Sequence, residues 1–310
     1  MTREDASPIP DDVRALLADV GPRWADDVAG NVRRMVDAFG PVLARAPKQG
    51  VEVARDIAYG PDARQQLDVY ASPRDERQPV VVFVHGGAFV DGNRNRSAEI
   101  YANVLYFFAR HGVIGINIEY RLAPAHPYPA GIEDVARAVA WTRANVARFG
   151  GDASRIFLAG HSAGAAHAAG YAYDERHHPA GGSGVAGLIV LSGRVRADNS
   201  AENPNARKVE AYYGSDASAY DDRSPVSHVS RRSVRTMIAF AEHENPLLDI
   251  YCLELAYRLA VAQRRAPRVL RLGGHNHTSL IAHINTGEDW LGREMLSFVA
   301  EGRVGPEGKE

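Results

Sequence analysis

Hydrophobic residues follow two different spacings along the chain, and the spacing changes near residue 50. In the first 50 residues they recur every three or four positions, which places them on one face of a helix. They are Val13, Leu16, Leu17 and Val20 in one segment and Trp24, Val28, Val32, Met35, Val36 and Phe39 in the next. Gly-Pro pairs at residues 21–22 and 40–41 interrupt the pattern. Residues 1–50 are therefore predicted to be a helical segment.

After residue 50, short apolar runs alternate with longer segments of helical periodicity. Predicted strands are residues 51–57, 66–70, 80–84, 113–118, 156–159, 185–191, 234–240 and 269–272. Predicted helices are residues 97–110, 131–148, 249–262 and 287–300. This alternation predicts an α/β fold with a mostly parallel sheet flanked by helices on both faces. A length of 310 residues with 45% hydrophobic residues suits one large domain, residues 51–310, that follows the helical segment.

Residues 194–230 break this alternation. They are polar, rich in Ser, Asp and Asn, and show no strong periodicity. We interpret them as an insertion of this domain near its functional site.

The sequence Gly-His-Ser-Ala-Gly at residues 160–164 is the strongest chemical signal. It follows the apolar run 156–159 and precedes the small-residue segment 165–169. This order, in which a buried strand is followed by the Gly-x-Ser-x-Gly pattern and then by helix-forming residues, is typical of a nucleophile elbow. Ser162 is therefore the candidate nucleophile, but a serine hydroxyl needs a base, an acid and oxyanion donors to react.

Residues 85–89, His-Gly-Gly-Ala-Phe, follow the apolar run 80–84. Two glycines could simply form a tight turn, but they also let backbone N–H groups point into a cavity. Such donors stabilise the negative charge that develops on a carbonyl oxygen during acyl transfer. Together with the N–H of Ala163, Gly86 and Gly87 are predicted to form an oxyanion hole with three donors.

The base is expected after the last strand, where His275 and His277 lie. We favour His277, because Thr278 and Ser279 follow it as a helix start, and His275 is the alternative. A His-x-His pair can also ligate a metal. No second cluster with ligand spacing occurs in the sequence, so no metal site is predicted.

The acid is expected after the strand at 234–240. Asn245 and Pro246 look like the N-cap and first position of a helix, which leaves Glu244 in the loop at the strand end. Glu244 is therefore the candidate acid. Asp249, the alternative, would lie in the first helical turn, where a carboxylate complements the helix dipole. Glu242 is expected to face solvent or another loop.

Charge and cysteine content exclude other classes of function. The net charge is -2 and no long block of like charge occurs, so neither nucleic acid nor an anionic membrane is an expected partner. Cys252 is the one cysteine, which rules out an internal disulfide and fits a reducing cytosol; we expect a buried structural thiol. Residues 1–5 are charged and no apolar segment follows, so neither a secretory signal nor a membrane span is expected. The predicted location is cytoplasmic.

Four elements together resemble the bacterial hormone-sensitive-lipase-like branch of the α/β-hydrolase carboxylesterases. They are residues 85–89, the Tyr-Arg-Leu-Ala-Pro of residues 120–124, residues 160–164 and His277. The resemblance covers about residues 51–302. It implies an α/β-hydrolase fold with an eight-stranded sheet, a Ser–acid–His triad, no cofactor, and activity on carboxylic esters. It also implies that the N-terminal helices form part of a cap over the site.

One segment departs from that family. Its members usually have Asp directly before Pro-Leu, whereas here Asn245 occupies that position and Glu244 precedes it. This segment and the stretch 57–70 are similar to kynurenine formamidase-like relatives. Arg121, in the Tyr-Arg-Leu-Ala-Pro element, is expected to form a structural ion pair rather than to bind substrate.

The sequence thus predicts a serine carboxylesterase that hydrolyses small-molecule esters with short to medium chains. A homodimer could form through the last strand and the helix at 287–300. An aryl formamide hydrolase using the same triad is one alternative. A non-catalytic ligand-binding protein on a hydrolase scaffold is another, and candidates for all three triad residues argue against it.

Overall fold

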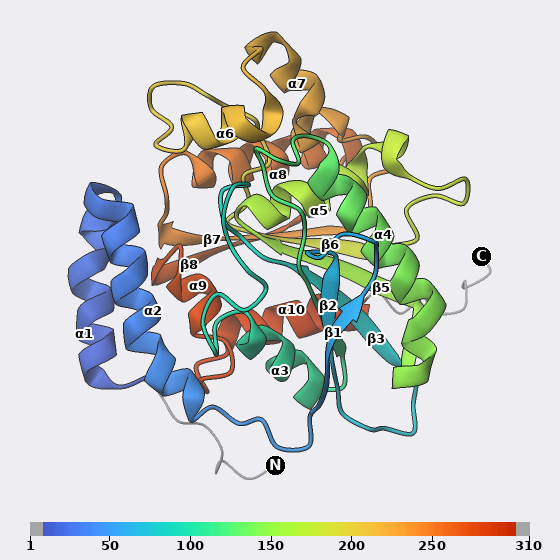
Figure 1. The fold of residues 1–310 in the computed structure, drawn as a ribbon. Helices are drawn as coiled ribbons and strands as arrows, with labels where there is room; N and C mark the ends of the chain where they lie inside the picture. Colours follow the sequence, from blue (N-terminus) through green and yellow to red (C-terminus); the bar gives the residue numbers. More distant parts are fainter. Residues whose placement is uncertain (1–8, 302–310) are drawn as a thin grey trace.

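A single sheet of eight strands forms the centre of the computed structural model, which describes residues 9–301 (Figure 1). The strands are β1 (Glu52–Ala58), β2 (Gln66–Ala71), β3 (Gln78–Val84), β4 (Ile114–Ile118), β5 (Gly151–His161), β6 (Gly187–Leu191), β7 (Thr236–His243) and β8 (Arg268–Asn276). Their order is β1-β2-β4-β3-β5-β6-β7-β8. β2 pairs antiparallel with β1 and β4, and the remaining neighbours are parallel. The predicted eight-stranded, mostly parallel sheet is confirmed.

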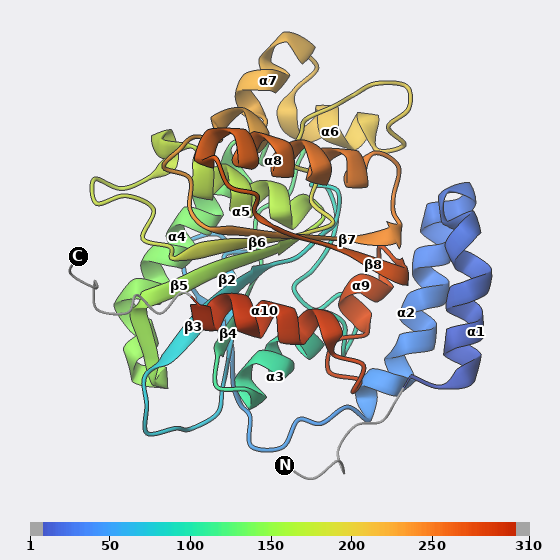
Figure 2. The same cartoon turned by 180° about the vertical axis from the view of Figure 1, so that it is seen from behind.

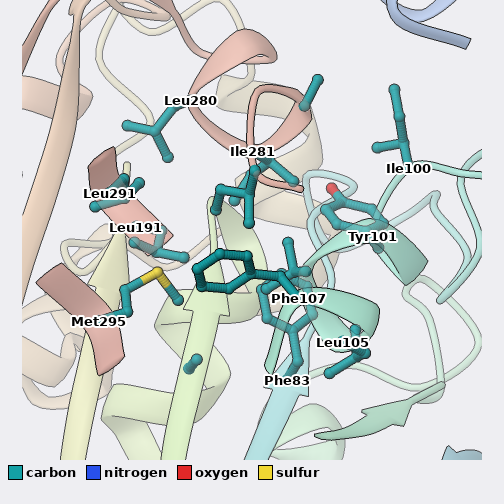
Figure 3. Packing of buried hydrophobic residues seen from close by; sticks show 14 of the residues in the cluster. Phe83, Ile100, Tyr101, Leu105, Phe107, Leu191, Leu280, Ile281, Leu291 and Met295 are labelled. Carbon is teal, nitrogen blue, oxygen red and sulfur yellow. The ribbon is translucent and has the colours of Figure 1, made fainter. Parts of the chain in front are cut away.

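Helices cover both faces of the sheet. One face carries α3 (Ala102–Arg110), α9 (Ser279–Ala282) and α10 (Trp290–Glu301), and the other carries α4 (Ala130–Asn145), α5 (Ala163–Tyr173) and α8 (Leu248–Gln263) (Figures 1 and 2). Successive residues of a strand point to opposite faces. Phe83 of β3 therefore packs with Phe107 and Met295 in one core (Figure 3), while Val82 and Val84 belong to the other.

Two predicted helix starts are wrong. The helix expected from residue 97 begins at Ala102, because the Ser97 hydroxyl accepts the N–H groups of Glu99 and Ile100 in a turn. Asn245 and Pro246 are not the N-cap and first position of a helix: the helix predicted for residues 249–262 begins at Leu248, after Leu247 in the left-handed region at φ 73°. Both starts are set by local turn geometry that the apolar pattern does not carry.

The N-terminal segment forms α1 (Asp11–Val20), a 3-10 turn (Gly21–Asp27) and α2 (Val28–Ala44). The two helices lie side by side next to β8 and α9 (Figures 1 and 2). The predicted apolar faces are inside: Val13 and Leu17 of α1 and Met35 and Phe39 of α2 are buried. They join the same core as α3 and α10, so this segment is an integral part of the fold.

Residues 194–230 contain more regular structure than their sequence suggests. They form α6 (Ala206–Tyr213) and α7 (Tyr220–Arg223) with short 3-10 turns, above α5 and α8 in Figure 1. α6 buries Val209, Tyr212 and Tyr213, and the Tyr212 ring stacks on Phe89 with centroids 4.8 Å apart. Eight residues are too few for this helical spacing to stand out in the sequence.

Across residues 9–301, no helix combines the length and the apolar character that crossing a membrane would require.

Candidate active site

Ser162 stands at a sharp turn between β5 and α5. Its φ of 56° and ψ of -119° are strained for a residue with a side chain. Two glycines make the turn sterically feasible: a Cβ on Gly160 would lie 2.6 Å from Ala165, and one on Gly164 would lie 2.2 Å from the Val84 carbonyl oxygen. The strand–turn–helix context expected for Ser162 is therefore present, and its hydroxyl faces a cavity.

His277 and Glu244 form a hydrogen-bonded pair at the ends of β8 and β7. Nδ1 of His277 lies 2.8 Å from Oε2 of Glu244, and both side chains are almost entirely buried. The other Glu244 oxygen accepts the Ser192 hydroxyl and the N–H of Ala241 at 2.8 Å. These contacts fix the carboxylate and, through it, the orientation of the ring. His277 lines the same cavity as Ser162.

The alternative acid and base residues lie elsewhere. Asp249 is in the first turn of α8, as the sequence predicted. Glu242 is exposed and accepts the N–H of Gly274 at 2.8 Å. The His275 ring contacts the Ser279 hydroxyl at 3.2 Å and packs on His283, outside the cavity lining. The structure thus brings Glu244, not Asp249, to the histidine that shares a cavity with Ser162.

The loop after β3 passes next to Ser162. A Cβ on Gly86 would lie 3.1 Å from Cβ of Ser162, and one on Gly87, at φ 149°, would lie 1.8 Å from the Asp91 carbonyl oxygen. The Gly86 N–H donates to the Tyr101 hydroxyl at 3.1 Å. That N–H is engaged within the protein, so the role of Gly86 as an oxyanion donor stays a prediction that this contact does not support. Within residues 9–301, three neighbouring N–H groups donate no hydrogen bond to a protein acceptor: those of Gly87, Ala88 and Ala163.

Tyr101 and His161 connect this loop to the histidine, and the sequence analysis did not identify either as a site residue. Nε2 of His161 lies 3.1 Å from the His277 carbonyl oxygen, which can only accept, and Nδ1 lies 3.1 Å from the Tyr101 hydroxyl. Burial lowers the pKa of His161 well below its ordinary value, so the ring is neutral. The direction of every bond follows: Gly86 N–H to Tyr101, Tyr101 O–H to His161, and His161 N–H to His277.

A buried charged network holds the base of the loop. The His85 ring bonds the Gly86 carbonyl oxygen at 2.7 Å and the Glu119 carboxylate at 2.8 Å. Burial alone would raise the pKa of Glu119, but the hydrogen bonds from His85 and from the Arg94 N–H hold it below its ordinary value. The Arg64 guanidinium adds a further ion pair. The loop therefore rests on a fixed support.

Arg121 and Cys252, which the sequence analysis expected to have structural roles, make structural contacts. Arg121 forms an ion pair with the buried Asp134 at 2.8 Å. Cys252 is fully buried, accepts the Gly193 N–H at 3.3 Å, and has its pKa raised by burial. In residues 9–301, no three His, Cys, Asp or Glu side chains are grouped so that they could hold a metal ion.

The cavity above Ser162 has a volume of about 470 Å³. Val28, Ala29 and Val32 of α2 contribute an apolar wall. Residues of the 194–230 insertion contribute a largely polar wall, formed by Arg194, Asn205 and Lys208 together with Pro204. The Asn245 side chain also lines the cavity and accepts the indole N–H of Trp24 at 2.8 Å, which ties the N-terminal segment to the Glu244 loop.

The sheet, its helices and the elbow define the α/β-hydrolase fold. The profile of the BD-FAE family matches residues 67–248, more than half of the chain, so the chain belongs to this family. Esterase LipC of Mycobacterium tuberculosis is 31% identical over 240 residues, 72% of this chain and 59% of that protein. Probable carboxylesterase 1 of Arabidopsis thaliana is 29% identical over 198 residues, 57% of this chain and 60% of that protein. The chain thus matches about three-fifths of the length of these relatives.

Solved structures show the same fold. A bacterial heroin esterase superposes with a TM-score of 0.72 at 23% identity, covering 96% of this chain and 98% of that one. Esterase LipW from Mycobacterium marinum gives a TM-score of 0.70 at 22% identity, and the superposition covers 97% of this chain and 99% of that one.

Proposed function

We propose that this protein is a serine carboxylesterase that hydrolyses small esters with short to medium chains. The observation that carries the proposal is the His277–Glu244 hydrogen bond of 2.8 Å, formed on the cavity that the Ser162 elbow enters. Relatives named esterase and carboxylesterase support it.

In the proposed reaction, Oγ of Ser162 attacks the ester carbonyl carbon and His277 takes the hydroxyl proton. Glu244 stabilises the resulting imidazolium and keeps the ring in the required tautomer. His277 then protonates the departing alkoxide, which leaves an acyl group on Ser162. A water molecule, deprotonated by His277, attacks the acyl carbon and releases the acid. This cycle uses protein groups alone, in keeping with the proposal that no cofactor is needed.

We assign the oxyanion donors to the N–H groups of Gly87, Ala88 and Ala163. Gly87 and Ala88 line the same cavity as Ser162, and Ala163 follows Ser162 in the chain. None of the three N–H groups has a protein acceptor among residues 9–301, whereas the Gly86 N–H is bonded to Tyr101. Donors that are already in place stabilise charge in the transition state without reorganisation. In this assignment Gly86 brings the loop close to Ser162 and Tyr101 holds it there.

The N-terminal residues 1–50 are proposed to act as a cap, because Val28, Ala29 and Val32 of α2 line the cavity. A volume of about 470 Å³ is near the lower part of the range of small-molecule sites. It suits a short or medium acyl chain rather than a bulk lipid.

Cytoplasmic location and a homodimer remain proposals from the sequence. β8 is the edge strand of the sheet and could pair with a second copy. Light scattering coupled to size-exclusion chromatography would measure the molar mass. A mass of twice the 33.7 kDa of one chain would support the dimer, and a mass of 33.7 kDa would contradict it.

An aryl formamide hydrolase is the second candidate. It is favoured by one observation, the use of Glu244 rather than a residue at position 245 as the partner of His277. Comparing kcat/KM for N-formylkynurenine with that for p-nitrophenyl butyrate would separate the two functions.

Replacing the nucleophile tests the main proposal. Ser162→Ala should lower kcat for p-nitrophenyl butyrate by at least about 10³-fold, because the other groups cannot form the acyl-enzyme. Ser215→Ala, at an exposed serine of the insertion, is the matched control and should keep full activity. Circular dichroism would check the fold of both variants.

A fluorophosphonate should label the wild-type chain and not Ser162→Ala. Full activity of the alanine variant would refute the proposed nucleophile. Absence of label on the wild type would favour a non-catalytic protein.

A further inference from the structure

The cavity above Ser162 carries an excess of positive charge. Among the described residues that line it, four are cationic, Arg33, Arg96, Arg194 and Lys208, and Asp91 is the one acid. Within residues 9–301, none of the four cations has a carboxylate within the 4.0 Å of an ion pair. Their charge is therefore available to a ligand.

Arg194 differs from the other three because it is buried. Only 1% of the residue is exposed, although it lines the cavity, whereas Arg33, Arg96 and Lys208 are exposed. Its backbone is fixed to the elbow, since its N–H donates to the carbonyl oxygen of Ser162 at 3.1 Å. The position of its side chain relative to the nucleophile is thus set by the fold.

The protein compensates this buried charge only in part. Nη1 donates to the neutral Oδ1 of Asn203 at 3.2 Å, and the guanidinium lies 5.9 Å from the centroid of the Tyr251 ring. Asp198 acts on it from beyond ion-pair distance, and its carboxylate accepts the Tyr251 hydroxyl at 2.5 Å and the Ser200 N–H at 2.7 Å. Burial lowers the pKa of Arg194 accordingly.

A buried charge without a counterion is costly, and proteins normally pair it. Elsewhere in the described residues that rule holds: Arg94, which is also buried, lies 3.3 Å from a carboxylate oxygen of Asp68 and 3.7 Å from one of Glu119. Arg194 is an exception on the wall of the cavity that contains the nucleophile. A guanidinium fork in this position matches a carboxylate with two parallel hydrogen bonds.

We propose that the substrate is an ester that carries a carboxylate, and that Arg194 binds this carboxylate while Ser162 attacks the ester bond. Arg33, Arg96 and Lys208 around the cavity would attract the anion. The inference rests on the proposed esterase function and specifies its substrate class.

Two pairs of esters of similar size test the proposal, with the charge placed on either side of the ester bond. Monoethyl adipate is compared with ethyl heptanoate for the acyl side, and 4-acetoxybenzoate with 4-methylphenyl acetate for the alcohol side. Hydrolysis is followed by pH-stat titration. In at least one pair the wild type should prefer the charged ester by about 10- to 100-fold in kcat/KM, the range expected for a charged hydrogen bond.

Arg194→Met removes the charge and keeps the length of the side chain. It should abolish the preference, mainly through KM of the charged ester, and the ratio within a pair cancels any effect common to both esters. Arg194→Lys keeps the charge but loses the fork and should retain part of the preference. Arg207→Met, an exposed arginine on α6 outside the cavity lining, changes the net charge equally and should leave the ratio unchanged.

Calorimetric binding to Ser162→Ala separates this proposal from the esterase function. Monoethyl adipate or 4-acetoxybenzoate should bind at least about 10-fold more tightly than its neutral counterpart, and the added Arg194→Met change should remove the difference. Such binding without hydrolysis by the wild type would refute the esterase and retain the anion site. Equal binding and equal turnover within both pairs would overturn the anion site and leave the esterase intact.

Discussion

The two segments that flank the Ser162 cavity are held to the body of the protein by different interactions. The N-terminal segment packs through apolar faces, with Met35 and Phe39 fully buried in the core that also contains α3 and α10. The 194–230 segment is held in part by polar contacts with the body of the protein, such as that of Arg196 with Glu254 of α8. Val195 and Val226 of this segment enter the core that also contains α5 and α8, and its other buried apolar residues form a separate small cluster around Tyr212 and Phe89.

This difference appears again in the walls of the cavity. α2 presents Val28 and Val32, whereas the 194–230 segment presents Arg194 and Lys208. The apolar wall suits the hydrocarbon part of a substrate, and the cationic wall suits a charged group. We therefore expect the N-terminal segment to contribute chiefly to stability and cavity shape, and the 194–230 segment chiefly to the proposed selectivity.

The largest effect is expected from the N-terminal packing. Phe39→Ala should lower the free energy of unfolding by about 3–5 kcal/mol, because it removes a fully buried ring and leaves a cavity. Urea denaturation followed by circular dichroism measures this. Asp37→Ala, at an exposed position of the same helix, should change it by no more than about 0.5 kcal/mol. A loss below about 1 kcal/mol for Phe39→Ala would show that α2 is not integral to the fold.

An intermediate effect is expected where the N-terminal segment meets the site. Trp24→Phe keeps a ring in place but removes the donor to Asn245, and leaving that buried oxygen unpaired should cost about 1–3 kcal/mol. The variant should also lower kcat, since Asn245 directly follows Glu244 in the loop. Trp290→Phe, at a tryptophan that is 43% exposed, is the control. An unchanged free energy of unfolding and an unchanged kcat would remove the link between this segment and the acid.

The smallest effect is expected from the ion pair under the 194–230 segment. Arg196→Met should cost no more than about 1 kcal/mol, because Arg196 and Glu254 are each about one-quarter exposed and solvent screens the pair. Raising the salt concentration should shrink the difference further. If thermal unfolding showed a cost above about 2 kcal/mol, the polar contacts would be as important to stability as the apolar ones.

The sequence predicted those features that depend on neighbours along the chain. Strands appeared as apolar runs, α1 and α2 as periodic patterns, and Ser162 through the glycines that its turn requires. Features that depend on residues distant in sequence were missed. The Gly86 N–H is unavailable because Tyr101, fifteen positions later, places its hydroxyl there. The absence of an ion-pair partner for the buried Arg194 likewise becomes visible only once the fold shows which carboxylates of residues 9–301 do not reach it.

The pairing of Glu244 with His277 was predicted in part from the sequence. Chain order and strand ends reduced the acid to Glu244 or Asp249, and the geometry of the loop before α8 decided between them. Because that loop turns at Leu247, three residues beyond Glu244, the first helical turn takes Asp249 to another position.

The two imidazole rings that lie in contact beside Ser162 have a consequence for the number of protons the site takes up. The His161 and His277 rings lie with centroids 4.5 Å apart, yet both nitrogens of His161 are already committed to Tyr101 and to a carbonyl oxygen. With its pKa lowered by burial, His161 takes up no proton as the solution is acidified through the ordinary range of histidine. His161 therefore adds no ionisation of its own to the acidic limb of the activity profile, although its ring is in contact with that of His277.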